Sequence, residues 1–451
     1  MKVHFIAIGG SAMHNLAIAL HLKGEEVTGS DDEIFEPSKG RLAKYSILPQ
    51  TIGWHPDKIT KDIDAIILGM HARADNPELL KAQELGLSIF SYPEYIYEQT
   101  KDKIRVVIGG SHGKTSITSM ILHVLNQHNI DHDYMVGAQL EGFECMVKLT
   151  KEAKIAVVEG DEYLSSPIDR RPKFHLYRPD IALMSGIAWD HINVFPTFEN
   201  YVEQFQIFVD KIEPNGSIIY CEMDQNVKNV CEKSRSDVEQ IPYATHPHRI
   251  ENGITYLQDG EKEYPLEIFG NHNLQNLSAA LLACIKLGLS KTEFYEAITT
   301  FTGASKRLEL VKRTTSSVMY KDFAHSPSKL KATTQALKSQ FPTRRLVACM
   351  ELHTFSSLNK DFLDQYKGSM ETADEAFIYY SPETIAHKRL DPISPKEISD
   401  AFASSNVTVF DNSDLLIKTL KEVHWKDANL LMMSSGNFNG VDFAELGEQL
   451  F

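Results

Sequence analysis

Short apolar runs alternate with amphipathic stretches along the whole chain. In the first hundred residues the apolar runs have the length of buried strands, and the segments between them space their apolar positions as helices do. The predicted strands are 3–8, 25–31, 64–69 and 87–90, and the predicted helices are 9–23 and 77–85. Strands that alternate with helices in this way favour a parallel sheet.

The same alternation continues to the end of the chain, with one interruption. Residues 217–268 are rich in strands and predict a hairpin around the turn Asp259-Gly260. Ser326 is expected to cap a helix that has Pro327 at its first position. The other predicted strands are 106–108, 155–158, 181–185, 318–320, 346–350, 376–379, 407–409 and 430–433.

The predicted architecture is α/β with three domains. A charged hinge at 101–103 and the segment 301–303 are the expected boundaries. The domains are a Rossmann-like domain at 1–103, a central nucleotide-binding domain with a mainly parallel sheet at 104–301, and a second Rossmann-like domain at 302–451.

Composition narrows the class of protein. The 451 residues carry a formal net charge of −15, which argues against nucleic acid as a partner. No apolar stretch approaches the roughly 18 residues of a membrane span, and Gly9-Gly10-Ser11 interrupts the apolar N-terminus, which argues against a signal peptide. The five cysteines are scattered without metal-ligand spacing, as in a reduced cytoplasmic protein.

The clearest functional signal lies at residues 105–125. A β-branched strand ends at Gly109-Gly110, and Lys114-Thr115-Ser116 opens an amphipathic helix, which is the order of a phosphate-binding loop. Lys114 would reach the β- and γ-phosphates of a nucleotide, and the Thr115 hydroxyl would bind Mg²⁺. The standard loop has a glycine where this chain has Ile108, so a chance glycine turn is the competing interpretation.

Polar residues follow two further strands of the central domain. Glu159 ends the apolar run 155–158, which favours a metal ligand over a solvated acidic turn. For Asp161 and Glu162 the two interpretations are evenly balanced. His191 follows the strand at 181–185, and a functional role is favoured there over a structural hydrogen bond.

Three more sites have a functional and a structural interpretation. Asn273 and Asn276 share a helix face and would either read an adenine edge or cap the helix. Arg307 lies in a predicted linker, where it would contact a phosphate or simply be solvated. The turn at Gly9-Gly10 lacks two glycines of the dinucleotide fingerprint, so a ligand-free strand-to-helix turn remains open.

Taken together, the ordered motifs resemble those of the Mur ligases over nearly the whole chain. These motifs are I-G-G-S-x-M at 8–13, G-S-H-G-K-T at 110–115, E-G-D-E-Y at 159–163, W-D-H at 189–191, G-N-H-N-x-x-N at 270–276, K-R-x-E at 306–309 and D-F-A-H-S-P at 322–327. The resemblance implies an ATP- and Mg²⁺-dependent ligase of peptidoglycan biosynthesis or recycling, cytoplasmic and monomeric or dimeric.

The resemblance also implies a role for each matching residue. The sugar-nucleotide site would comprise Gly9, Gly10, Ser11 and Met13, with His55 and His71 near the uridine. The ATP site would comprise Gly110, Ser111, His112, Gly113, Lys114, Thr115, Ser116, Asn273, Asn276, Arg307 and Asp322. Mg²⁺ would be bound by Thr115, Glu159 and His191, and His325 would lie near the acceptor. The expected catalytic set is Lys114, Glu159, His191, Arg307 and His325.

The implied reaction joins the carboxylate of UDP-N-acetylmuramate to an amine through an acyl phosphate. Stretches at 159–179, 322–325 and 434–440 resemble family members that use the tripeptide L-alanyl-γ-D-glutamyl-meso-diaminopimelate, and L-alanine is the alternative acceptor. The loop at 351–357 lacks the arginine usual in both groups. A non-ligase P-loop NTPase, a dehydrogenase and a folyl-polyglutamate-type ligase are more distant alternatives, the last disfavoured because that branch lacks the first domain.

Overall fold

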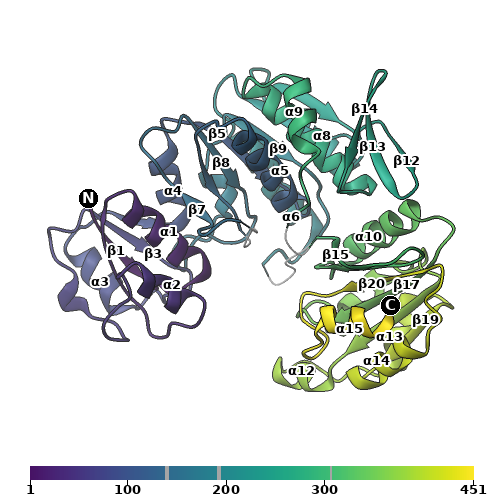
Figure 1. The fold of residues 1–451 in the computed structure, drawn as a ribbon. Coiled ribbons are helices and arrows are strands. Elements are labelled where there is room, and N and C mark those ends of the chain that lie inside the picture. The colour runs from purple at the N-terminus through teal and green to yellow at the C-terminus, as the bar shows by residue number, and fades with distance from the viewer. Residues whose placement is uncertain (138–141, 190–193, 305–306) are drawn as a thin grey trace. The chain divides into compact units, whose positions relative to one another are not determined.

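The computed structural model describes residues 1–137, 142–189, 194–304 and 307–451, and the chain is α/β with mainly parallel sheets, as predicted (Figure 1). It divides into two compact units. The first comprises 1–244 and 276–297, and the second comprises 245–275 and 298–451. The three-domain boundaries at 103/104 and 301/302 stay a proposal.

The N-terminal sheet, purple in Figure 1, has four parallel strands in the order β2-β1-β3-β4. Its strands are β1 (Lys2–Ile6), β2 (Glu26–Ser30), β3 (Ala65–Leu68) and β4 (Ile89–Ser91). Its helices are α1 (Ser11–Leu22), α2 (Ser38–Lys44), η1 (Pro56–Lys58), α3 (Pro77–Glu84) and α4 (Tyr92–Thr100). β1 ends earlier than predicted because Ala7 has a left-handed φ of 68°.

The central sheet has seven strands in the order β11-β10-β9-β5-β8-β6-β7, and all are parallel except β7. These strands are β5 (Ile104–Gly109), β6 (His132–Met135), β7 (Val147–Lys148), β8 (Ile155–Glu159), β9 (Ile181–Met184), β10 (Ser217–Cys221) and β11 (Glu239–Tyr243). The accompanying helices are α5 (Lys114–Gln127), η2 (Lys173–Leu176), α6 (Phe198–Asp210), α7 (Gln225–Cys231), α8 (Asn271–Lys286) and α9 (Lys291–Ile298).

The second unit contains two sheets. The predicted hairpin is present in a three-stranded antiparallel sheet formed by β12 (His248–Glu251), β13 (Ile254–Asp259) and β14 (Lys262–Leu266). The other sheet has the order β15-β16-β20-β17-β18-β19, with only β15 antiparallel. Its strands are β15 (Glu309–Arg313), β16 (Val318–Asp322), β17 (Arg345–Leu352), β18 (Glu375–Tyr380), β19 (Val407–Phe410) and β20 (Ala428–Met433). Its helices are α10 (Pro327–Gln340), α11 (Lys360–Leu363), η3 (Asp364–Tyr366), α12 (Pro382–His387), α13 (Pro395–Phe402), α14 (Ser413–Glu422) and α15 (Phe443–Leu450).

Three further features of the chain bear on the predictions. Ser326 precedes α10 as predicted, but its side chain makes no capping hydrogen bond, so that part of the prediction is wrong. The five cysteines are buried free thiols. Within the described residues, no helix combines the length and apolar character needed to cross a membrane.

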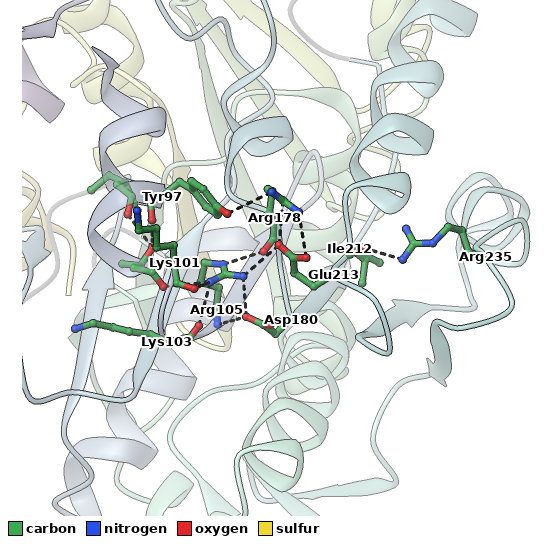
Figure 2. A network of polar contacts seen from close by, with 11 residues as sticks. Tyr97, Lys101, Lys103, Arg105, Arg178, Asp180, Ile212, Glu213 and Arg235 are labelled. Atoms are coloured by element: carbon green, nitrogen blue, oxygen red, sulfur yellow. Dashed lines mark hydrogen bonds and ion pairs between the residues drawn. The ribbon is translucent and has the colours of Figure 1, made fainter. Parts of the chain in front are cut away.

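A buried arginine fastens the N-terminal sheet domain to the central sheet (Figure 2). Arg105, on β5, donates to the carbonyls of Thr100, Lys101 and Lys103 at 3.2, 2.7 and 3.1 Å. These carbonyls lie at and just beyond the C-terminal end of α4, where helical partners are missing. On its other side the guanidinium forms an ion pair with Asp180 at 3.2 Å. Arg105 therefore links α4 to the base of the central sheet.

Arg105→Met should destabilise the protein by about 2–3 kcal/mol, because it leaves the partly exposed Asp180 carboxylate and several carbonyls without their donor. Arg178→Met is the matched control, since Arg178 lies over the same Tyr97 ring but is half exposed. We expect the control to cost less than about 1 kcal/mol. Thermal unfolding followed by circular dichroism compares the two variants, and equal losses would contradict the anchoring role of Arg105.

Candidate active site

The loop between β5 and α5 has the geometry of a phosphate cradle. Gly110 has a φ of 134°, and a Cβ there would lie 2.2 Å from Oγ of Ser185. Gly113 has a φ of 78° and immediately precedes α5, and a Cβ there would lie 2.5 Å from Oδ1 of Asn276. Only glycine fits these two positions without strain. The chain thus keeps the backbone open at a helix N-terminus, where anions bind favourably.

The segment that follows β9 holds this loop through hydrogen bonds. Ser111 donates its N–H to the carbonyl of Gly186 at 2.9 Å, and its hydroxyl accepts from the N–H of Ala188 at 2.8 Å. The hydroxyl of Ser185 donates to the carbonyl of His112. Ser116 is buried in the first turn of α5. The segment after β9 therefore fixes the loop, a contribution that local sequence did not reveal.

Lys114 is surrounded by oxygen atoms. Its ammonium donates to the carbonyl of Gly110 at 2.6 Å and to Oε2 of Glu162 at 2.7 Å. Burial lowers the pKa of Lys114, but the charges of Glu162, Asp161 and Glu159 outweigh that effect and raise it. Lys114 therefore stays a cation at neutral pH, as the electrostatics of phosphate binding require.

Glu159 and Thr115 lie together at the end of β8. The Thr115 hydroxyl donates to Oε1 of Glu159 at 2.9 Å, and the Gly137 N–H donates to Oε2 at 3.0 Å. Burial raises the pKa of the Glu159 carboxyl. A carboxylate and a hydroxyl beside a phosphate loop fit Mg²⁺, which takes few protein oxygens and completes its shell with water and phosphate. The third predicted ligand, His191, lies outside the described residues.

The structure separates the two carboxylates that the sequence left undecided. Glu162 pairs with Lys114 and accepts from the Tyr201 hydroxyl at 3.1 Å. Asp161 forms an ion pair with Lys173 at 2.7 Å. Burial raises the pKa of Asp161, but the Lys173 and Lys114 charges outweigh it and lower the pKa to about 2. No cluster of three metal-binding His, Cys, Asp or Glu side chains occurs in the described part of the chain.

The two asparagines of α8 are both buried. The Asn276 side chain lies against Gly113 of the phosphate loop. The Asn273 amide donates to the carbonyl of Phe269 at 2.9 Å. Asn273 lies within the helix and bonds backward along it, so its side chain does not cap the helix N–H groups. The adenine-binding role of both residues stays a prediction.

The predicted sugar-nucleotide residues gather at the carboxyl edge of the first sheet. Gly10 precedes α1, Met13 is buried in its first turn, and Ser11 is exposed. His71 is exposed just after β3. In this sheet β1 lies between β2 and β3. The chain order reverses between β1 and β3, which is where parallel sheets bind ligands. His55 lies between β2 and β3, and its N–H donates to Glu78 at 2.6 Å.

The sequence predicts a strand that ends at Asp31, but it does not reveal the contact that this side chain makes. Oδ2 of Asp31 accepts the Gly9 N–H at 2.6 Å and so fixes the turn after β1. Burial raises the pKa of Asp31 to about 6. No short-range pattern indicates this contact, because it joins two adjacent strand ends.

Asp31→Asn should remove a pH dependence of stability. The folded protein binds the Asp31 proton more tightly than the unfolded chain, so wild-type stability falls as pH rises from 3.8 through about 6. Asparagine keeps an acceptor for Gly9 without the charge, so we expect a gain of about 2 kcal/mol at pH 7.5 that fades towards pH 4. Urea unfolding at several pH values measures this, and parallel profiles of variant and wild type would contradict it.

In the second unit, the predicted residues gather at the end of β16. The Arg307 guanidinium lies over the Phe323 ring at 5.3 Å. Asp322 accepts the N–H groups of Leu308 and Ala324 at 2.7 and 2.6 Å, and burial raises its pKa despite the Arg307 charge. His325 contacts the Phe323 carbonyl through Nδ1 at 2.8 Å. Their contact with ATP or acceptor stays a prediction.

The stretches 351–356 and 434–440 meet at the carboxyl ends of β17 and β20. Glu351 is buried and accepts from the Ser434 hydroxyl at 2.5 Å and from the Phe438 N–H at 2.8 Å. A cavity of about 530 Å³ opens beside them at the same edge of the sheet. Its lining includes both acidic and basic side chains, among them His353, Glu383, Lys388 and Asp411.

Three family models match consecutive parts of the chain. They are the "Mur ligase family, catalytic domain" at residues 2–103, the "Mur ligase middle domain" at 108–284 and the "Mur ligase, glutamate ligase domain" at 306–436. The fold and the phosphate-loop site define an ATP-dependent ligase that forms a C–N bond, and the chain belongs to the Mur ligase family, whose members act in peptidoglycan synthesis.

The chain is similar to relatives that are named for two different acceptors. It is 31% identical to UDP-N-acetylmuramate–L-alanine ligase of Caldicellulosiruptor saccharolyticus, over 84% of this chain and 83% of that protein. It is 27% identical to UDP-N-acetylmuramate–L-alanyl-gamma-D-glutamyl-meso-2,6-diaminoheptandioate ligase of Escherichia coli, over 98% of this chain and 96% of that protein. The structure of a murein peptide ligase from Psychrobacter arcticus has the same fold, with a TM-score of 0.63 and 22% identity. The match covers 100% of this chain and 98% of that chain.

Proposed function

We propose that this protein activates the carboxylate of UDP-N-acetylmuramate with ATP and joins it to the amine of L-alanyl-γ-D-glutamyl-meso-diaminopimelate. The observation that carries the proposal is the group of Lys114, Thr115 and the buried Glu159 at the phosphate loop, in the same compact unit as the turn after β1. The family is ATP-dependent and typically uses Mg²⁺.

The chemistry requires positive charge at the phosphate loop. A carboxylate that attacks the γ-phosphate of ATP brings two anions together, so the barrier falls when fixed cations and N–H groups lie around the transferred group. Lys114 would supply one cation, and the N-terminus of α5 would supply backbone N–H donors. Thr115 and Glu159 would hold Mg²⁺, which supplies further charge neutralisation when bound. The acceptor amine then attacks the acyl phosphate, and phosphate leaves.

The second unit would supply the acceptor site. The cavity beside Glu351 is larger than an alanine side chain needs, and it mixes acidic and basic groups. An acceptor with both a free amine and several carboxylates complements such a lining. The motifs at 159–179, 322–325 and 434–440 support the same choice of tripeptide. L-Alanine remains the second candidate because several similar relatives are named for that acceptor.

A competition experiment between L-alanine and the tripeptide identifies the acceptor substrate. The protein is incubated with ATP, Mg²⁺, UDP-N-acetylmuramate and equimolar L-alanine and tripeptide, and the products are separated by mass spectrometry. We expect the tripeptide adduct to dominate at least about tenfold. A product that contains only alanine would replace the proposed acceptor while leaving the ligase chemistry intact. ATP hydrolysis with neither adduct would contradict the proposed function.

A further inference from the structure

The side chain of Asn15 lies between the helix that follows the sugar-nucleotide turn and the small β6–β7 hairpin. It is only 4% exposed. Its amide nitrogen donates to the carbonyl of Ser11 at 2.8 Å and lies 3.2 Å from Nε2 of His14. Its amide oxygen accepts from the N–H of Met146 at 3.0 Å and from the thiol of Cys145 at 3.4 Å. Both ends of the amide are satisfied, which fixes its orientation.

The hydrogen bonds continue from Met146 to the phosphate loop. The carbonyl of Met146 accepts the N–H of Val136 at 2.9 Å, at the point where β6 and β7 pair. The next residue, Gly137, donates its N–H to Oε2 of Glu159 at 3.0 Å. The other oxygen of Glu159 accepts from Thr115 at 2.9 Å. Asn15 is therefore connected to the Glu159 carboxylate through one strand pair.

The position of Glu159 depends on this connection. Its carboxylate is 7% exposed, so each oxygen needs a donor. The donor to Oε2 is the backbone N–H of Gly137. β6 itself is held by parallel pairing with β8 over residues 132–135, but Val136 and Gly137 lie beyond that ladder, where the Val136 N–H bonds to the Met146 carbonyl. β7 is only two residues long, Val147–Lys148. Such a short strand is weakly held by its own ladder, so the Asn15 side chain adds to its anchorage together with the Tyr134 hydroxyl, which donates to the Cys145 carbonyl at 3.1 Å.

We propose that Asn15 is a positioning residue for the ATP–metal site, which it serves from the sugar-nucleotide helix by holding β7, β6 and hence Glu159 in place. This inference rests on the proposed function, because it takes Glu159 as a magnesium ligand. Asn15 touches neither phosphate nor metal in this arrangement. It acts through the backbone of Met146, Val136 and Gly137.

The test is the Mg²⁺ dependence of nucleotide binding. Asn15→Leu keeps nearly the same shape but neither donates nor accepts, and Asn15→Ala is a second variant in case the leucine impairs folding. Binding of a fluorescent ADP analogue is titrated with Mg²⁺. Because changes in groups that orient a metal ligand typically cost 10- to 100-fold and Asn15 is further removed, we expect the half-saturating Mg²⁺ concentration to rise about three- to tenfold.

Asn76→Ala is the matched control. Asn76 is also 4% exposed, but its side chain accepts from the N–H groups of Glu78 and Leu79, which keeps these contacts at the start of α3. It should lose similar stability without altering the Mg²⁺ response. Hydrogen exchange of the Val136 and Gly137 amides, without nucleotide, should be faster in both Asn15 variants and unchanged in Asn76→Ala.

The outcomes separate the inference from the function on which it rests. If the Asn15 variants keep the wild-type Mg²⁺ midpoint and the wild-type exchange at Val136 and Gly137, the positioning role is overturned. An equal Mg²⁺ shift in Asn76→Ala would also overturn it, because general destabilisation would then explain the effect. If the wild-type protein binds no Mg²⁺–ADP at all, the proposed function is itself wrong.

Discussion

Lys114→Ala is expected to lower ATP-dependent ligation at least about a thousandfold, because it removes the cation that we propose faces the transferred phosphate. It should also destabilise the protein by about 3 kcal/mol, since Glu162 would remain buried opposite an empty position. Loss of activity and loss of stability therefore coincide in this single variant. Steady-state turnover and urea unfolding measure the two effects separately.

A double variant separates those two effects. In Lys114→Ala combined with Glu162→Gln, the buried negative charge is gone, and the glutamine oxygen still accepts from Tyr201. We expect most of the lost stability to return while ligation stays about a thousandfold below wild type. Recovery of ligation in the double variant would mean that Lys114 serves only the fold and would contradict its phosphate role.

Glu159→Gln is expected to keep or raise the stability of the protein while it lowers the ligation activity. The carboxylate is buried, and burial raises its pKa, so a neutral amide of the same size should be at least as stable. The amide can accept from Gly137 and donate to Thr115, which keeps both present contacts occupied. Mg²⁺-dependent ligation should fall about a hundredfold or more, because a neutral amide binds Mg²⁺ weakly.

Asp161→Asn is the variant with which the stability change of Glu159→Gln is compared. Asp161 is paired with Lys173, and its pKa lies at about 2, so its ionised form stabilises the fold at neutral pH. The amide should therefore lower stability where Glu159→Gln does not. Equal stability changes in the two variants, or unchanged Mg²⁺ dependence in Glu159→Gln, would contradict the assignment of Glu159 as the metal carboxylate.

The parts of the structure that depend on neighbouring residues were predictable. The phosphate loop is a strand, a glycine turn and a helix within about twenty residues, so apolar spacing and glycine positions suffice to find it. The mainly parallel sheets follow from the alternation of strands and helices, and they are present in all three large sheets. Lys114, Thr115 and Glu159 also lie together as expected.

The parts that depend on distant contacts were not predictable. The choice of Glu162 as the partner of Lys114 joins residues 48 positions apart, and the acidic motif offers three candidate carboxylates. The bond from Asp31 to Gly9 and the bonds of Asn15 to the β6–β7 hairpin also cross between elements. The grouping of 245–275 with 298–451 in one compact unit likewise depends on contacts between segments that are separate in sequence. Pairing across elements leaves no periodic signal in sequence.

Isotope transfer tests the central claim most directly. UDP-N-acetylmuramate labelled with ¹⁸O in its carboxylate is converted by the protein with ATP, Mg²⁺ and the tripeptide, and the released inorganic phosphate is analysed by mass spectrometry. Attack of the carboxylate on the γ-phosphate predicts one ¹⁸O atom in each phosphate released with product. Ligated product accompanied by unlabelled phosphate would contradict the proposed activation at Lys114 and Glu159.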